Sequence, residues 1–145
     1  MEIALKPWGS LLLRWVIGWL FIVAGVLKVM DPVAFVQAIE GYRILSGPPA
    51  SLLALYLPWL EILCGAGLLT RRFFYTGSLA LLTALTLVFI VALVSAWARG
   101  LDIECGCFGP SGSVGQIGIA LVRDFVLLAA LVWLWLEEQK SARPV

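Results

Sequence analysis

Histidine is absent from the sequence, and charged residues are few. The 145 residues include 10 lysines and arginines against 9 aspartates and glutamates, so the net charge is +1. The absence of histidine excludes His-ligated haem and His-containing zinc sites. The lack of a basic excess removes the electrostatic signature of a nucleic-acid-binding protein. Three cysteines also cannot form a closed four-thiolate site. From these absences together we expect neither a metal centre nor a nucleic-acid partner.

Apolar residues make up most of the chain. They account for 62% of it, against 13% charged residues, and the mean hydropathy is +1.02. So few polar residues cannot cover a water-soluble domain of this size. Long apolar runs occur at 11–29, 52–69, 75–97 and 117–136, and each is close to the ~20 residues that cross a bilayer as a helix. The sequence predicts one domain, 1–145, with an all-α fold: an integral membrane four-helix bundle.

The first apolar run has a second interpretation, a cleaved signal peptide. It is longer than a typical signal-peptide core and continues into Lys28-Val29-Met30-Asp31-Pro32, which lacks a small-residue cleavage site. We therefore predict a retained membrane anchor.

The charges in the short connections predict an orientation. Arg71 and Arg72 lie almost alone between the second and third runs, and the positive-inside rule keeps such residues in the cytoplasm. Both chain termini are then cytoplasmic, and the connections 30–51 and 98–116 face outward. In a bacterium this corresponds to the inner membrane, with both connections in the periplasm.

The first outer connection has the signature of a short helix. Asp31-Pro32 is a helix N-cap followed by proline at the first helical position. Apolar residues then recur at helical spacing, and these are Phe35, Val36, Ile39 and Tyr42. The cluster Ser46-Gly47-Pro48-Pro49 ends the pattern. We predict a short amphipathic helix between the first two spans, lying on the membrane surface.

The second outer connection contains Cys105-Gly106-Cys107. Disulfides form and exchange readily in the periplasm. A disulfide between residues two apart needs a backbone that glycine adopts most easily, and a strained, accessible disulfide is the more easily reduced kind. We predict that Cys105 and Cys107 form a redox-active pair. The alternative is a pair that only staples the loop or stays reduced, although so short a loop gains little stability from a staple.

Charged residues within the apolar runs form a second candidate site, because ionisable groups at membrane depth usually face the bundle interior. Glu61 lies midway along the second run, Lys28 ends the first, and Arg123-Asp124 lies in the outer part of the fourth. We expect these residues to converge beneath the cysteines, where Arg99, Arg123 or Lys28 would favour the reactive thiolate. The alternative for Glu61 is an ion pair with Lys28 or Arg123 that only fixes the helix register.

Two further residues in the spans receive structural interpretations. Arg14 lies nearer the cytoplasmic end of the first run, so we expect its side chain to snorkel to the interface. Cys64, in the second run, is expected to be a small buried packing residue and not a third redox thiol.

A combination of motifs resembles a known family. The stretch from Gly18 to Lys28, followed by Asp31-Pro32 and Phe35, is similar to the opening signature of DoxX-like membrane proteins. Leu57-Pro58-Trp59-Leu60-Glu61 and then Cys105-Gly106-Cys107-Phe108-Gly109 narrow the resemblance to the MauE (methylamine utilisation) branch.

The resemblance implies a four-helix inner-membrane protein associated with redox or disulfide chemistry. For the MauE branch it implies maturation of a disulfide-rich periplasmic dehydrogenase subunit. The matching positions are Lys28, Glu61, Cys105 and Cys107. Other DoxX-like proteins are linked to quinone-coupled sulfur oxidation, which makes a quinone the cofactor to test for.

A quinone pocket would combine the buried charges with aromatic side chains, and the candidates are Phe21, Trp59 and Phe108. The chain lacks the Cys-x-x-Cys pair that the vitamin K epoxide reductase family carries in a span. This difference argues against direct quinone reduction by the protein.

The function predicted from these residues is thiol-disulfide exchange between the Cys105/Cys107 pair and a periplasmic thioredoxin-like protein or a disulfide-containing client. Two alternatives stay open. The first is a non-enzymatic assembly factor for a periplasmic redox enzyme, which would keep its activity without the cysteines. The second is a small-molecule transporter in which Glu61 and Lys28 line the path.

Overall fold

The structure, a computed structural model, describes residues 2–70, 74–101 and 116–142. These residues form five helices and no strand, which confirms the all-α prediction. The helices are α1 (Glu2–Met30), α2 (Pro32–Gly41), α3 (Pro48–Thr70), α4 (Tyr75–Ala98) and α5 (Gln116–Ala142).

Four of these helices are long and apolar enough to cross a membrane, at Trp8–Met30, Pro48–Thr70, Tyr75–Ala98 and Ile117–Ala142. They coincide with the four predicted spans, and three of them continue several residues beyond the apolar runs. The extension is expected, because an apolar run marks only the hydrocarbon layer, whereas the helix continues into the interface. The chain is therefore a multi-pass membrane protein.

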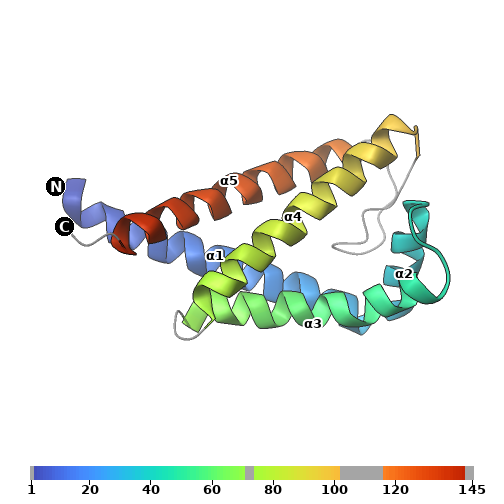
Figure 1. Cartoon of the computed structure of the whole chain (residues 1–145), viewed down its shortest axis with the longest axis horizontal. Helices are drawn as coiled ribbons and strands as arrows, with labels where there is room; N and C mark the ends of the chain where they lie inside the picture. The colour runs from blue at the N-terminus through green and yellow to red at the C-terminus, as the bar shows by residue number, and fades with distance from the viewer. Residues whose placement is uncertain (1, 71–73, 102–115, 143–145) are drawn as a thin grey trace.

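The four long helices pack in a chain of neighbours. α1 packs mainly on α3, α3 on α4, and α4 on α5, whereas α1 and α5 share few contacts. Figure 1 shows α2 at one end of the bundle and both chain termini at the other. We call these the α2 end and the terminal end. The residues behind the predicted orientation, Arg71 and Arg72, lie outside the described part of the chain.

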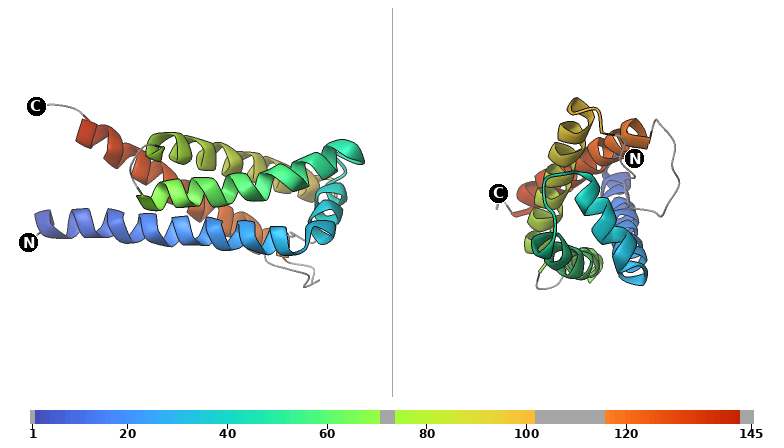
Figure 2. Two further views of the ribbon diagram at one scale, coloured as in Figure 1. Left: turned by 90° about the horizontal axis from the view of Figure 1, so that it is seen from below. Right: turned by 90° about the vertical axis from the view of Figure 1, so that its right-hand side faces the viewer.

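The helix between the first two spans is present as predicted and begins at the predicted cap. The Asp31 carboxylate accepts a hydrogen bond of 3.0 Å from the backbone N–H of Ala34, and Pro32 is the first helical residue. Proline disfavours helical conformation in the residue before it, which separates α1 from α2. Figure 2 shows α2 standing across the end of the long helices.

The apolar face of α2 packs on protein, and its predicted position at the membrane surface stays a prediction. Phe35 is buried in a cluster with Ala54 and Leu57 of α3, and Phe89 of α4 packs against this cluster. Tyr42, just after α2, packs with α4 and α5. Hence α2 covers the end of the bundle, since its apolar residues gain more complete burial between helices than at the lipid boundary.

Glycines set the close contact between α1 and α3. A Cβ added to Gly65 would lie 2.7 Å from the carbonyl oxygen of Gly18, and one added to Gly25 would lie 2.7 Å from the carbonyl oxygen of Pro58. Small residues are how membrane helices bring their backbones together, because lipid supplies no hydrophobic force between them. This contact fixes how α1 and α3 are placed against each other.

The main core lies between these helices and α4 and α5. It includes Ile17, Phe21, Leu68, Leu79 and Leu131, and Cys64 is buried among them. Cys64 therefore has the packing role that its position predicts.

Replacement of Gly65 by alanine tests the glycine contact. Gly65→Ala should lower the free energy of unfolding by about 1–3 kcal/mol, because the added methyl group overlaps the backbone of α1. Gly77→Ala in α4 is the matched control, since a Cβ there meets nothing within 4 Å, and the better helix propensity of alanine predicts equal or greater stability. Denaturant unfolding in detergent micelles, followed by tryptophan fluorescence, measures both. Equal effects of the two changes would show that the close contact is absent.

Candidate functional site

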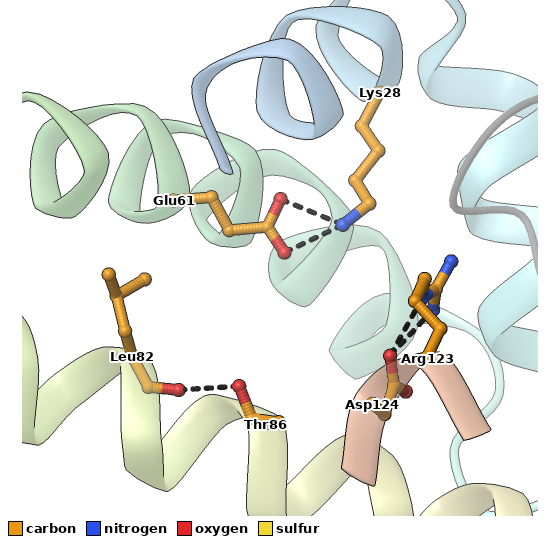
Figure 3. A network of polar contacts seen from close by, with 6 residues as sticks. All are labelled: Lys28, Glu61, Leu82, Thr86, Arg123 and Asp124. Carbon is orange, nitrogen blue, oxygen red and sulfur yellow. Dashed lines mark hydrogen bonds and ion pairs between the residues drawn. The ribbon is translucent and has the colours of Figure 1, made fainter. Parts of the chain in front are cut away.

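A buried ion pair joins α1 to α3 in the interior of the bundle. The ammonium group of Lys28 donates to both carboxylate oxygens of Glu61, at 2.6 and 2.7 Å. The two side chains are only 3% and 2% exposed, so the pair is shielded from both water and lipid. Figure 3 shows Lys28 reaching from α1 toward the Glu61 carboxylate on α3. The structure thus brings together the two residues that the sequence selected.

Two aromatic rings complete the surroundings of the Lys28 ammonium. Its nitrogen lies 5.2 Å from the ring centre of Phe35 in α2 and 5.2 Å from that of Phe89 in α4. A cation at this distance is attracted by the negative face of an aromatic ring, more strongly when it is desolvated. α2 therefore supplies part of the charge environment of Lys28 as well as covering it.

A second ion pair lies on α5 beside the first. The Arg123 guanidinium contacts one carboxylate oxygen of Asp124, with its Nε at 2.9 Å and a terminal nitrogen at 2.8 Å. Asp124 is 4% exposed, and its other carboxylate oxygen has no hydrogen-bond partner among the described residues. Arg123 is more open, with a side chain that is 27% exposed. The pair therefore presents one unsatisfied acceptor to the interior.

A small cavity of about 40 Å³ connects the two ion pairs. Its polar lining comes from Lys28, Glu61, Thr86, Arg123 and Asp124. The Thr86 hydroxyl donates to the carbonyl oxygen of Leu82 at 2.8 Å, so its own oxygen stays available as an acceptor (Figure 3). One water molecule takes up roughly 30 Å³ and needs several polar partners. The cavity has the volume and the polar lining that a water molecule requires.

The charged groups of this polar cluster compensate one another. Two cations, Lys28 and Arg123, face two anions, Glu61 and Asp124. Such an arrangement is what an apolar interior tolerates, because an isolated charge at membrane depth is costly whereas a hydrogen-bonded pair is not. All four residues line one cavity, and their position beneath the cysteines stays a prediction. The structure also shows which residues pair: Glu61 pairs with Lys28, and Arg123 pairs with Asp124.

Arg99 lies apart from the polar cluster. Its guanidinium donates to the backbone carbonyl oxygens of Tyr42 at 2.6 Å, Ser95 at 3.1 Å and Arg43 at 3.4 Å. It therefore ties the end of α4 to the segment after α2. The prediction that Arg99 tunes the cysteines stays a prediction, and the structure adds that this side chain already holds two segments together.

Of the three aromatic residues predicted for a quinone pocket, the structure describes Phe21 and Trp59. Phe21 does line the cavity, but Trp59 is 53% exposed on the outer surface of α3 and is not among its lining residues. Cavities that hold ligands of this size are usually about 300–1,000 Å³, whereas the cavity at the polar cluster is about 40 Å³. This cavity is therefore smaller than such a ligand site, and the quinone pocket stays a prediction because Phe108 lies outside the described residues.

Three predicted site residues, Cys105, Cys107 and Phe108, lie outside the described residues. The chain that carries them runs from Leu101, after α4, to Gln116, at the start of α5. Leu101 and Ile117 both pack against the cluster that contains Tyr42. Both described ends of this connection are therefore at the α2 end.

Sequence reasoning misjudged or missed three residues. Arg14 does not snorkel: it is 8% exposed, and its guanidinium carbon lies 5.9 Å from the centre of the Tyr75 ring. Phe89 and Thr86 escaped attention because a single phenylalanine in an apolar run carries no signal. For Thr86, the available signal was a hydroxyl side chain within an apolar run.

These features define a class of protein: a multi-pass membrane bundle of four spanning helices with paired charges in its interior. A sequence model described as methylamine utilisation protein MauE matches residues 6–137. The chain therefore belongs to the MauE family, which confirms that part of the resemblance. The likeness to DoxX-like proteins stays a prediction.

Two relatives show how far the similarity extends. The methylamine utilization protein MauE of Paracoccus denitrificans is 28% identical over 129 residues, which cover 88% of this chain and 69% of that protein. The protein of the same name from Methylophilus methylotrophus is 28% identical over 109 residues, covering 74% of this chain and 57% of that protein. No solved structure matches the chain significantly. The match thus leaves a substantial part of each relative outside the comparison.

Single and double replacements test whether Lys28 and Glu61 form a buried pair of opposite charges. Lys28→Met and Glu61→Leu should each destabilise the protein by about 3–5 kcal/mol, because each leaves the partner as an uncompensated buried charge. The double variant should recover most of the loss, since both charges are then replaced by apolar groups of similar volume. Denaturant unfolding in micelles gives all three values.

The matched control is Lys140→Met at the terminal end. Lys140 lies 3.6 Å from Glu137 in an open ion pair, with 68% of its side chain exposed. Its loss should change the stability by less than about 1 kcal/mol. Additive effects of Lys28→Met and Glu61→Leu, with no recovery in the double variant, would contradict the buried pair.

Proposed function

We propose that this protein is a single-domain protein of the bacterial inner membrane that exchanges disulfides through Cys105 and Cys107. The partner is a periplasmic thioredoxin-like protein or a disulfide-containing client. The relatives are named for methylamine utilization, and we extend that link to this chain as part of the proposal. The DoxX-like resemblance and its redox association belong to the same proposal.

One observation carries the proposal. The connection between α4 and α5 contains two cysteines separated by one glycine, and its described ends pack at the α2 end beside Tyr42. A disulfide between two cysteines this close is strained. Strained, accessible disulfides are easily reduced, and they are catalytic more often than structural. Cys64, by contrast, is buried in the core, so it cannot meet a protein partner.

The proposed exchange moves two electrons in two balanced steps. The thiolate of one cysteine attacks a sulfur of the partner disulfide, forming a mixed disulfide while the second partner sulfur leaves as a thiolate. The thiolate of the other cysteine then attacks the mixed disulfide. The Cys105/Cys107 pair ends oxidised, and the partner ends as a dithiol. The reverse sequence oxidises the partner, and no step requires a quinone.

The polar cluster has a supporting role in this proposal. Lys28 and Glu61 set the position of α1 against α3, and Arg123 lies about two turns from the start of α5. Its side chain is the more open of the two cations. We assign Arg123 as the positioning cation for the cysteine connection, because a nearby guanidinium stabilises a thiolate.

Two alternative functions remain, a transporter and an assembly factor. The cavity at Lys28 and Glu61 argues against a transport path, because its volume is about 40 Å³ and its charges are paired. The assembly-factor reading predicts that a Cys105→Ser/Cys107→Ser double variant still matures its periplasmic client. Disulfide exchange predicts that this variant is inactive although it folds.

Trapping of a mixed disulfide is the direct test of exchange. Cys105→Ser or Cys107→Ser should accumulate a covalent adduct with a periplasmic protein in cells, because the resolving thiolate is missing. The adduct appears on non-reducing gels, disappears with dithiothreitol, and is identified by mass spectrometry. Cys64→Ser is the control and should give no adduct, since its exchange pair is intact. Absence of an adduct from both single variants would refute the exchange.

Labelling in spheroplasts tests the proposed orientation. After mild reduction, a membrane-impermeant thiol reagent should label Cys105 and Cys107, because both face the periplasm in the proposed topology. A variant whose only accessible cysteine is Gln139→Cys, on an exposed position near the end of α5, should react only after the membrane is permeabilised. The opposite pattern would place the cysteine pair in the reducing cytosol, where disulfides rarely persist.

A further inference from the structure

A second cavity, of about 230 Å³, lies at the terminal end of the bundle, far from the polar cluster. Its polar lining comes from Ser10 and Arg14 of α1, Tyr75 of α4, and Glu137 and Glu138 of α5. α1 and α5 share few contacts, and Figure 1 shows both chain ends on this side of the molecule. The cavity is much larger than the one between the ion pairs and has room for several water molecules or a small polar group.

Arg14 is the unusual residue of this cavity. Only 8% of it is exposed, and its Nε has no hydrogen-bond partner among the described residues. The guanidinium carbon lies 5.9 Å from the centre of the Tyr75 ring, an interaction that does not use the Nε hydrogen. A buried guanidinium with an unused donor beside a cavity is a ready binding site for a phosphate or carboxylate oxygen.

The acidic side of the cavity limits what can bind there. Glu137 and Glu138 contribute carboxylates to the same lining as Arg14. A purely anionic ligand is disfavoured by these carboxylates, although Glu137 lies 3.6 Å from Lys140 in an open ion pair, and a purely cationic one is disfavoured by the guanidinium. A zwitterion whose negative group meets Arg14 and whose positive group meets the glutamates satisfies both sides. Ser10 and Ser141, which also line the cavity, add hydroxyl groups that can accept or donate hydrogen bonds.

The position of the cavity favours a lipid over a soluble zwitterion. Trp8, two residues before Ser10, is 67% exposed, and tryptophan prefers the depth of the lipid headgroups. Leu11 and Leu134 form the apolar part of the wall, and Leu11 is itself 41% exposed. A headgroup bound here can leave its acyl chains along the apolar outer surface of α1.

We propose that the terminal-end cavity binds the phosphoethanolamine headgroup of a phospholipid, with the phosphate on Arg14 and the primary ammonium near Glu137 and Glu138. This site is separate from the cysteine connection, and it does not depend on the proposed disulfide exchange. Its occupation stabilises the contact between α1 and α5, because the headgroup bridges a cation on one helix and carboxylates on the other.

The test measures the unfolding midpoint and lipid retention of the full chain in detergent, with added lipid of defined headgroup. Phosphatidylethanolamine should raise the midpoint and be retained in native mass spectra at one lipid per chain. Phosphatidylcholine has no ammonium hydrogen to donate, and phosphatidylglycerol has no cation. Both should bind more weakly, by roughly tenfold or more, since choline cannot donate a hydrogen bond to the glutamate carboxylates and phosphatidylglycerol brings no positive charge to them.

Variants assign the two halves of the site. Arg14→Gln should weaken phosphatidylethanolamine binding roughly ten- to hundredfold, because a charge-assisted bond to phosphate is lost. Glu137→Gln/Glu138→Gln should keep the binding but lose the preference for ethanolamine over choline. Arg43→Gln, on an exposed position at the α2 end, is the matched control and should bind as the parent does. If Arg14→Gln fails to fold, Arg14→Lys serves in its place and should retain the midpoint shift in reduced form.

Three results would overturn the proposal. The first is an equal midpoint shift for all three lipids. The second is full phosphatidylethanolamine binding by Arg14→Gln. The third is an effect of inorganic phosphate or free phosphoethanolamine as large as that of the lipid, which would make the ligand a soluble one.

Discussion

The contact between the Lys28 ammonium and the Glu61 carboxylate holds the rest of the structure in place. Two opposite charges without water are tolerated only when they meet, and here both carboxylate oxygens take part, at 2.6 and 2.7 Å. A shift of α1 by one turn along α3 would leave each charge alone in an apolar interior. The glycines at the α1–α3 contact allow the two backbones to approach closely enough for the pair to form.

The other helices are arranged around this pair. α2 places the Phe35 ring beside the ammonium, α4 places Phe89 on another side, and α5 adds the Arg123–Asp124 pair across a cavity large enough for a water molecule. Each of these elements therefore contributes one part of the charge environment of the Lys28 ammonium. The connection that carries the two cysteines begins and ends at the α2 end of the bundle.

The two ends of the bundle differ in how their charges are satisfied. In the polar cluster each charged side chain contacts one of opposite charge, one Asp124 oxygen is left without a hydrogen-bond partner among the described residues, and little space remains. At the terminal end a buried arginine keeps an unused donor beside a cavity about six times larger. A cluster whose charges are paired with one another suits a structural role. A larger cavity beside a buried donor without a partner suits an external ligand, and in a membrane the most abundant one is lipid.

The sequence by itself determined the four spans, the capped helix after Asp31, and the candidate charges, because apolar length, proline position and the cost of charge in lipid are local properties. It also carried the motifs that identify the family. Only the tertiary structure decided that Glu61 pairs with Lys28 and not Arg123, that Trp59 faces outward, that α2 covers the bundle, and that Arg14 is buried beside Tyr75. These outcomes depend on the rotation of each helix about its axis and on which helices are neighbours. Residues far apart in the chain fix both of these through packing, and the order of residues within any one helix does not specify them.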